Sequence, residues 1–143
     1  MSVEHDPDVL MAKASTVRRC VGAVRTVRQA QPPLEAWMAQ DLIVLNLQRA
    51  IQACLDTANH LIASNGWELP RSASQSMDLL ARHGVIPSSL LVPLTAMVGF
   101  RNIAVHEYTV LDPAILDSIA TKHLPDLEAF ASIVLGIVAE GGP

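Results

Sequence analysis

The stretch that most constrains the fold lies between two chain-breaking signals, Pro32-Pro33 and Asn65-Gly66. Apolar side chains recur between them at helical spacing, and the stripe that they form changes face partway along. These residues are Leu34, Trp37, Met38, Leu42, Leu45, Leu47, Ala50, Ile51, Cys54, Ala58, Leu61 and Ile62. The pattern predicts one long helix that packs against several neighbours and forms the spine of a helical bundle.

A first helix is expected before this spine, over about residues 8–29. Arg18 and Arg25 lie on one side of it, and five apolar residues recur at helical spacing on the other: Val17, Cys20, Val21, Val24 and Val27. The run Gln31-Pro32-Pro33 ends this helix, because proline lacks an amide hydrogen and restricts the residue before it. We expect these two long helices to run antiparallel.

Shorter helical regions are expected after the spine. Ser72 and Gln75 have the spacing of a capping box for a helix that ends near residue 83. A fourth helix runs toward Arg101. Asp112-Pro113 has the chemistry of an N-cap followed by a first-turn proline, and Pro125 is expected to split or kink the region that follows.

Composition agrees with helix-on-helix packing. The chain of 143 residues is 50% hydrophobic but only 3% aromatic, which suits helices better than strands. This length fits one domain with its own core. We predict an all-α bundle of about five or six helices, formed by residues 1–143 as one domain, with residues 1–7 and 140–143 frayed.

The sequence carries no signal for a membrane, a secretory pathway or a metal. No apolar run has the length of a membrane span, and Met1 to Pro7 lacks the regions of a signal peptide, so we expect a cytoplasmic protein. Cys20 and Cys54 lie in apolar helical stretches and are expected to be buried, reduced thiols. The histidines are scattered, so no metal site and no cofactor are predicted.

Charge gives a mixed indication about nucleic acid. The formal net charge of −4 argues against a generic nucleic-acid coat. Five of the ten basic residues nevertheless fall in the first helix: Lys13, Arg18, Arg19, Arg25 and Arg28. This bias could attract RNA or an acidic partner, and it equally fits the solvated outer face of a helix.

Residues 101–108, Arg-Asn-Ile-Ala-Val-His-Glu-Tyr, concentrate the chemistry of the chain. Arg101 supplies a permanent, forked positive charge for a phosphate. His106 can move protons near neutral pH, and Asn102 can orient either group. Such a cluster suits a phosphodiester as substrate.

Arg101 falls on the apolar line of its helix, at about 100° per residue from Leu90 through Leu94 and Met97. A guanidinium in that place must find an anion or hydrogen-bond partners. The alternative to a functional role is an ion pair that ties helices together, with Asp112, Glu107 or Asp56 as partner.

His106 follows Arg101 by five residues, a spacing that turns the two side chains away from each other on one helix. Local unwinding after Val105, or a second copy of the chain, would let them converge. The alternative for a histidine at a helix end is an interaction with the helix dipole.

The run from Gly99 to Tyr108 resembles the signature of the HEPN superfamily, and more narrowly that of HepT-type toxins: Arg, four residues, His, one residue, Tyr. The segments Leu47–Ile62 and Ser76–Leu80 also resemble that family. The similarity covers most of the chain after about Trp37. Together with Asn102, Tyr108 and the matching second helix, the pattern is fairly specific.

The resemblance implies a HEPN-like homodimer in which the two motif segments face each other and share a ribonuclease site. It implies metal-independent cleavage of RNA by the neighbouring 2′-hydroxyl group, with no cofactor. In that chemistry His106 acts as general acid and base, Arg101 stabilises the charge of the phosphorane, and Asn102 positions one of them.

The resemblance gives Tyr108 a separate role. HepT-type toxins belong to type VII-like toxin–antitoxin systems, in which a nucleotidyltransferase antitoxin of the MntA type attaches AMP to the matching tyrosine. Bulk and negative charge beside Arg101 and His106 would compete with the RNA phosphate. The alternative is a tyrosine that only packs or donates a hydrogen bond.

Two other functions stay open at this point. One is a non-catalytic HEPN module that binds nucleotide or RNA and pairs with a nucleotidyltransferase, and the other is a purely structural helical dimer.

The long helix also carries a line of four polar residues: Arg49, Gln52, Asp56 and His60. Such a line must face water, either in an RNA cleft, at a dimer interface or in open solvent. We leave these four residues outside the expected catalytic set.

Overall fold

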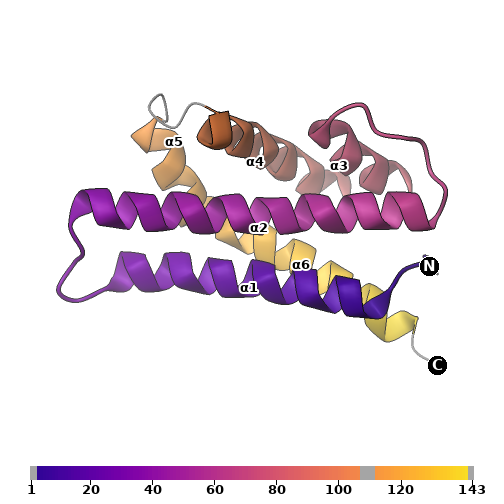
Figure 1. Ribbon diagram of the computed structural model, residues 1–143, viewed down its shortest axis with the longest axis horizontal. Helices are drawn as coiled ribbons and strands as arrows, with labels where there is room; N and C mark the ends of the chain where they lie inside the picture. The colour runs from indigo at the N-terminus through magenta and orange to yellow at the C-terminus, as the bar shows by residue number, and fades with distance from the viewer. Residues whose placement is uncertain (1–2, 107–111, 142–143) are drawn as a thin grey trace.

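The computed structural model describes residues 3–106 and 112–141, without the side chains of Val105 and His106. In this part of the chain every regular element is helical, so the all-α prediction is confirmed (Figure 1). The elements are α1 (Pro7–Gln29), α2 (Ala36–Ser64), α3 (Ala73–Arg82), α4 (Ser88–His106), α5 (Pro113–Ser118), the π-helical segment η2 (Ile119–His123) and α6 (Leu124–Glu140).

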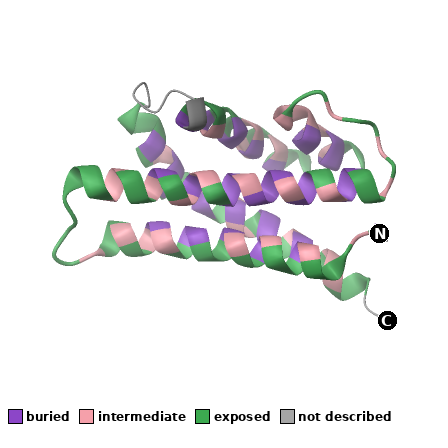
Figure 2. Cartoon of the chain, in the orientation of Figure 1, coloured by how far each residue is buried: buried purple, intermediate pink, exposed green. Residues whose placement is uncertain are grey.

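The two long helices α1 and α2 lie side by side and antiparallel, as predicted (Figure 1). α6 packs against α1 and α2, while α3 and α4 pack on α2 and on each other. The buried residues follow the inner faces of these helices (Figure 2). Leu10, Leu47, Leu61 and Leu127 are fully buried, and each such side chain contributes about 1.5–3 kcal/mol through removal from water.

Local signals in the sequence set the helix ends. The Ser72 side chain accepts a hydrogen bond from the Gln75 amide, and the Asp112 side chain accepts one from the Ala114 amide at 2.9 Å. Gly66 follows the end of α2 with a φ of 65°, in the left-handed region that favours glycine. The predicted caps and the predicted stop are confirmed.

The prolines of the second half have different effects. Pro93 lies inside α4, and the helix continues through it. Pro125 lies at the start of α6, directly after η2. The expected interruption is therefore confirmed, and it takes the form of a π-helical segment that joins α5 to α6.

The N-terminal segment differs from the fraying that the sequence predicted for residues 1–7. Val3 is buried in the core. The Glu4 amide donates to Asn65 Oδ1 and Asn65 Nδ2 donates to the Glu4 carbonyl, both at 2.9 Å. The Asp6 amide donates to His60 Nε2. Residues 3–6 are thus held against the end of α2, which a terminal position in the sequence does not reveal.

The first turns of α2 also differ from expectation. The helix contacts several neighbours, as predicted, but four apolar residues of its stripe are exposed rather than packed. Trp37 is 62% exposed, and Met38, Leu42 and Leu45 are about 40% exposed. Periodicity indicates that a face needs cover, and within the described residues this chain does not supply it.

Within the described residues, none of the helices combines the length and the apolar character needed to cross a membrane.

Candidate functional site

Arg101 emerges from a buried line of α4. Leu90, Leu94 and Met97 on that line are 5%, 2% and 1% exposed, and Arg101 at its end is half-buried, as its helical phase predicted. The position of Arg101 on α4 therefore places its guanidinium at the edge of the core, next to α2.

The Arg101 guanidinium is held by neutral oxygen atoms. Its Nη2 donates to Gln52 Oε1 at 2.6 Å, and its Nη1 donates to Asn102 Oδ1 at 2.8 Å. No described carboxylate forms an ion pair with it, so the expected alternatives Asp56 and Asp112 are wrong; the third, Glu107, lies outside the described residues. Among the described residues the positive charge is thus oriented without being neutralised, which suits it to an incoming anion.

Gln52 is in turn fixed by a polar chain that reaches α1. Its Nε2 donates to Asp56 Oδ1 at 2.8 Å, and Lys13 Nζ donates to Asp56 Oδ2 at 2.9 Å. Lys13 therefore balances the charge of Asp56, and the Gln52 amide keeps its oxygen turned toward Arg101. The polar line on α2 was evident in the sequence, but Gln52 was not expected to belong to the site. The signal was the four-residue spacing of Gln52 and Asp56 on one face.

A hollow of about 300 Å³ opens beside Arg101. It is bounded by one face of α2, by the segment that leads into α3 and by the first turns of α3. Arg101 and Gln52 both line it, so the candidate site has an accessible side.

The remaining predicted site residues are only partly within the described structure. Asn102 is exposed and contacts Arg101, as described above. For His106 the structure gives the backbone alone, as the last residue of α4. Tyr108 lies outside the described residues.

The basic residues of α1 are mostly engaged in contacts within the chain. Arg25 forms a bidentate pair with Glu128, with distances of 2.8 and 2.6 Å. The Arg25 guanidinium holds the pKa of the Glu128 carboxyl below its usual range. Arg28 lies 3.9 Å from Asp117, and Arg18 donates to Ser132 Oγ. This face of α1 therefore serves to join α1 to the C-terminal elements.

The two cysteines are free and buried, as predicted. Burial raises the pKa of both thiols, and for Cys54 the increase is large. A thiol in that environment is a poor nucleophile. Within the described residues, no three side chains of the metal-binding types are grouped so that they could hold a metal ion.

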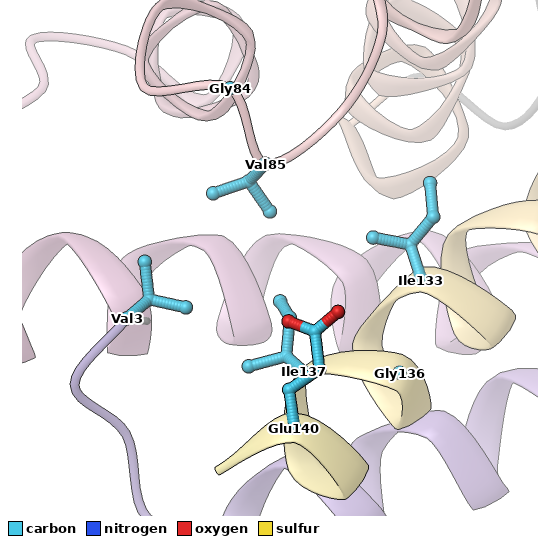
Figure 3. A pocket seen from close by; sticks show the side chains of 7 residues that line it. All are labelled: Val3, Gly84, Val85, Ile133, Gly136, Ile137 and Glu140. Atoms are coloured by element: carbon cyan, nitrogen blue, oxygen red, sulfur yellow. The ribbon is translucent and has the colours of Figure 1, made fainter. Parts of the chain in front are cut away.

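A second pocket, of about 320 Å³, lies away from Arg101, where the N-terminal segment, the turn after α3 and the end of α6 meet (Figure 3). Val85, Ile133 and Ile137 give it apolar walls, and Glu140 lies at its edge. It contains no group that matches the chemistry of residues 101–108.

Known proteins resemble this chain over most of its length. The family description "Ribonuclease HepT-like" matches residues 22–134. The chain is 35% identical over 128 residues to the mRNA nuclease HepT of Shewanella oneidensis, a match that covers 89% of this chain and 96% of that protein.

Solved structures are similar as well. A toxin–antitoxin crystal structure with AMP-PNP matches with a TM-score of 0.82 and 34% identity, and covers 90% of this chain and 98% of its own. The tri-AMPylated Shewanella oneidensis HEPN toxin in complex with the MNT antitoxin matches with a TM-score of 0.78 and 33% identity, with the same coverage.

Proposed function

Since the chain belongs to the HepT-like ribonuclease family, we propose that it is an endoribonuclease toxin that cuts RNA at a site formed by Arg101, Asn102 and His106. The observation that carries this proposal is the state of Arg101. Its guanidinium is oriented by Gln52 and Asn102 and has no carboxylate partner among the described residues. A guanidinium that is oriented in this way suits the phosphate of an RNA strand. The protein is proposed to act in the cytoplasm.

The proposed reaction needs no metal ion. The 2′-hydroxyl group of one nucleotide attacks the adjacent phosphorus, its proton is taken up by His106, and a phosphorane forms. Arg101 stabilises the added negative charge. His106 then returns the proton to the departing 5′-oxygen, which leaves a 2′,3′-cyclic phosphate and a 5′-hydroxyl group. Asn102 accepts a hydrogen bond from Arg101 and so limits its movement.

We further propose that two chains form the site as a homodimer. α4 is helical through His106, and five helical residues turn Arg101 and His106 apart by about 140°. This supports convergence across a dimer rather than by unwinding before His106. Ile103 is 45% exposed beside Asn102, and the exposed apolar residues of α2 lie toward the same end of the molecule as the C-terminus of α4 (Figure 1).

Regulation is proposed to act through Tyr108, with a nucleotidyltransferase antitoxin as the partner. The support is the family pattern, in which Tyr108 follows His106 by two residues, and the similarity to a tri-AMPylated HEPN toxin in complex with its antitoxin. AMP groups on Tyr108 would place bulk and negative charge near Arg101 and repel RNA.

Growth and RNA cleavage test the nuclease proposal. Wild-type protein is expected to arrest cells and to cut RNA in the presence of EDTA. Arg101→Ala and His106→Ala are each expected to lower the cleavage rate by about 10²-fold or more. Arg82→Ala, on the exposed end of α3, is the matched control and should behave as wild type. Wild-type protein that leaves RNA intact but binds it through Arg101 would instead favour the non-catalytic module.

A further inference from the structure

The hollow beside Arg101 has a positively charged lining. Arg71 and Arg101 both line it, and none of its lining residues is a carboxylate. The whole chain has a net charge of −4. Arg71 is exposed and forms no ion pair among the described residues. Two guanidinium groups around one hollow therefore create a local positive potential in an acidic protein.

Among the side chains that line the hollow, those with polar groups left over for a ligand offer hydrogen-bond donors. Ser76 Oγ donates to Asn59 Oδ1 at 2.7 Å, which leaves both N–H groups of the Asn59 amide for a ligand. Both polar atoms of the Gln52 side chain are already used, by Arg101 and by Asp56. Arginine and the Asn59 amide nitrogen offer no acceptor, so the hollow suits an anion with several acceptor oxygens.

The neighbouring hollow provides a contrast. It measures about 460 Å³ and shares Arg71 and Ser72 with the first, but its lining includes the Asp78 carboxylate. Asp78 is paired with Arg82 at 3.2 Å, and its carboxylate makes this second lining less favourable for a phosphate. Of these two adjoining hollows, the one that Arg101 enters is the one without a carboxylate in its lining.

We propose that this hollow is a binding site for a second phosphate of the RNA strand, next to the one that is cut, with Arg71 and Asn59 as its contacts. This inference rests on the proposed nuclease function. Arg101 and Arg71 line the same hollow, so a strand whose scissile phosphate lies at Arg101 would pass beside Arg71 if it continued through this hollow. Arg71 then contributes to substrate binding and to the placement of the strand, and takes no part in bond breaking.

The test uses the full-length protein and an oligonucleotide with one ribonucleotide, so that one bond can be cut. Arg71→Ala is expected to raise KM several-fold while kcat changes by less than about twofold, because a phosphate contact provides affinity. The dependence of log KM on log salt should become shallower by about one charge. Arg71→Lys should retain most of the affinity, and Arg82→Ala, which removes the other arginine near α3, should match wild type.

Neutral methylphosphonate at each phosphate beside the cut gives the second arm. A methylphosphonate in place of the phosphate that Arg71 contacts should raise the KM of the wild-type protein. The same substitution should have little further effect on the KM of Arg71→Ala. Equal KM values for Arg71→Ala and Arg82→Ala would overturn the proposal. A site for free phosphate ions would leave the methylphosphonate substrates unaffected, and that result also overturns it. Failure of the nuclease function is distinct, because wild type would then cut no oligonucleotide.

Discussion

At the scale of single residues, the site depends on which charged side chains form ion pairs with each other in the described part of the chain and which do not. Lys13 balances Asp56, and Arg25 balances Glu128, whereas within the described part of the chain Arg101 contacts the side-chain oxygens of Gln52 and Asn102 and no carboxylate. An arginine bound by carboxylates would have to break those pairs before it could bind a phosphate. Arg101 can exchange weaker, neutral contacts for an ionic one, which favours the ligand.

Gln52 is expected to act as a positioning residue for Arg101. Gln52→Met keeps a similar volume but loses both the acceptor for Arg101 and the donor to Asp56. We expect kcat to fall by about tenfold or more, with a smaller change in KM, because the guanidinium loses its orientation. Steady-state cleavage of a single-site oligonucleotide measures both constants.

Gln48→Met, one turn earlier on α2, is the control for this change. It should leave kcat and KM as in wild type. Thermal unfolding of the two variants should agree closely, since Gln52 is only partly buried. A kcat for Gln52→Met equal to that of the control would exclude the positioning role.

At the scale of helices, local chemistry was readable from the sequence and distant contacts were not. The Ser72 cap, the Asp112 cap and the left-handed Gly66 could be predicted because each depends on residues a few positions apart. The contact between Gln52 and Arg101 joins residues 49 positions apart. Its geometry depends on how α4 crosses α2, which apolar spacing alone does not specify.

The pair Arg25–Glu128 predicts a pH dependence of the contact between α1 and α6. The folded pKa of Glu128 is lowered, so the stability that it provides is complete above its unfolded pKa and is lost as pH falls through the folded pKa. Glu128→Gln should therefore lower the urea midpoint modestly at neutral pH, and its difference from wild type should shrink on acidification. Urea unfolding monitored by circular dichroism from neutral to acidic pH measures this.

Glu68→Gln is the matched control, since its carboxylate lies 3.7 Å from Arg82 in a more exposed pair. Its midpoint should stay close to that of wild type throughout. A constant difference between Glu128→Gln and wild type over the whole pH range would contradict the assignment of the effect to ionised Glu128.

At the scale of the whole molecule, α2 and α4 carry apolar side chains that the sequence marks for burial but that the described part of this chain leaves exposed. Trp37, Leu42 and Leu45 follow a helical stripe, yet they remain exposed in this chain. Ile103 adds a further apolar side chain next to Asn102. Sequence periodicity could predict the stripe, but it could not tell whether its cover comes from the same chain or from another.

Mixed dimers test the proposed sharing of the site between chains. Arg101→Ala and His106→Ala are each expected to be inactive alone. When the two are expressed together, a mixed dimer combines the intact His106 of one chain with the intact Arg101 of the other. Such dimers should therefore recover part of the wild-type cleavage. Co-purification through two different tags, followed by an RNA cleavage assay, measures the recovery. No recovery in a verified mixed dimer would mean that each chain supplies both residues.

Under the proposed sharing of the site between two chains, the continuous α4 helix has a consequence for dosage. A site that needs Arg101 from one chain and His106 from another exists only after two chains have met, and the number of such encounters grows with the square of the chain concentration while most chains are single. A cell that makes a few copies by leaky expression would then carry almost no active enzyme. A burst of synthesis would cross a threshold and become toxic within a narrow range of expression.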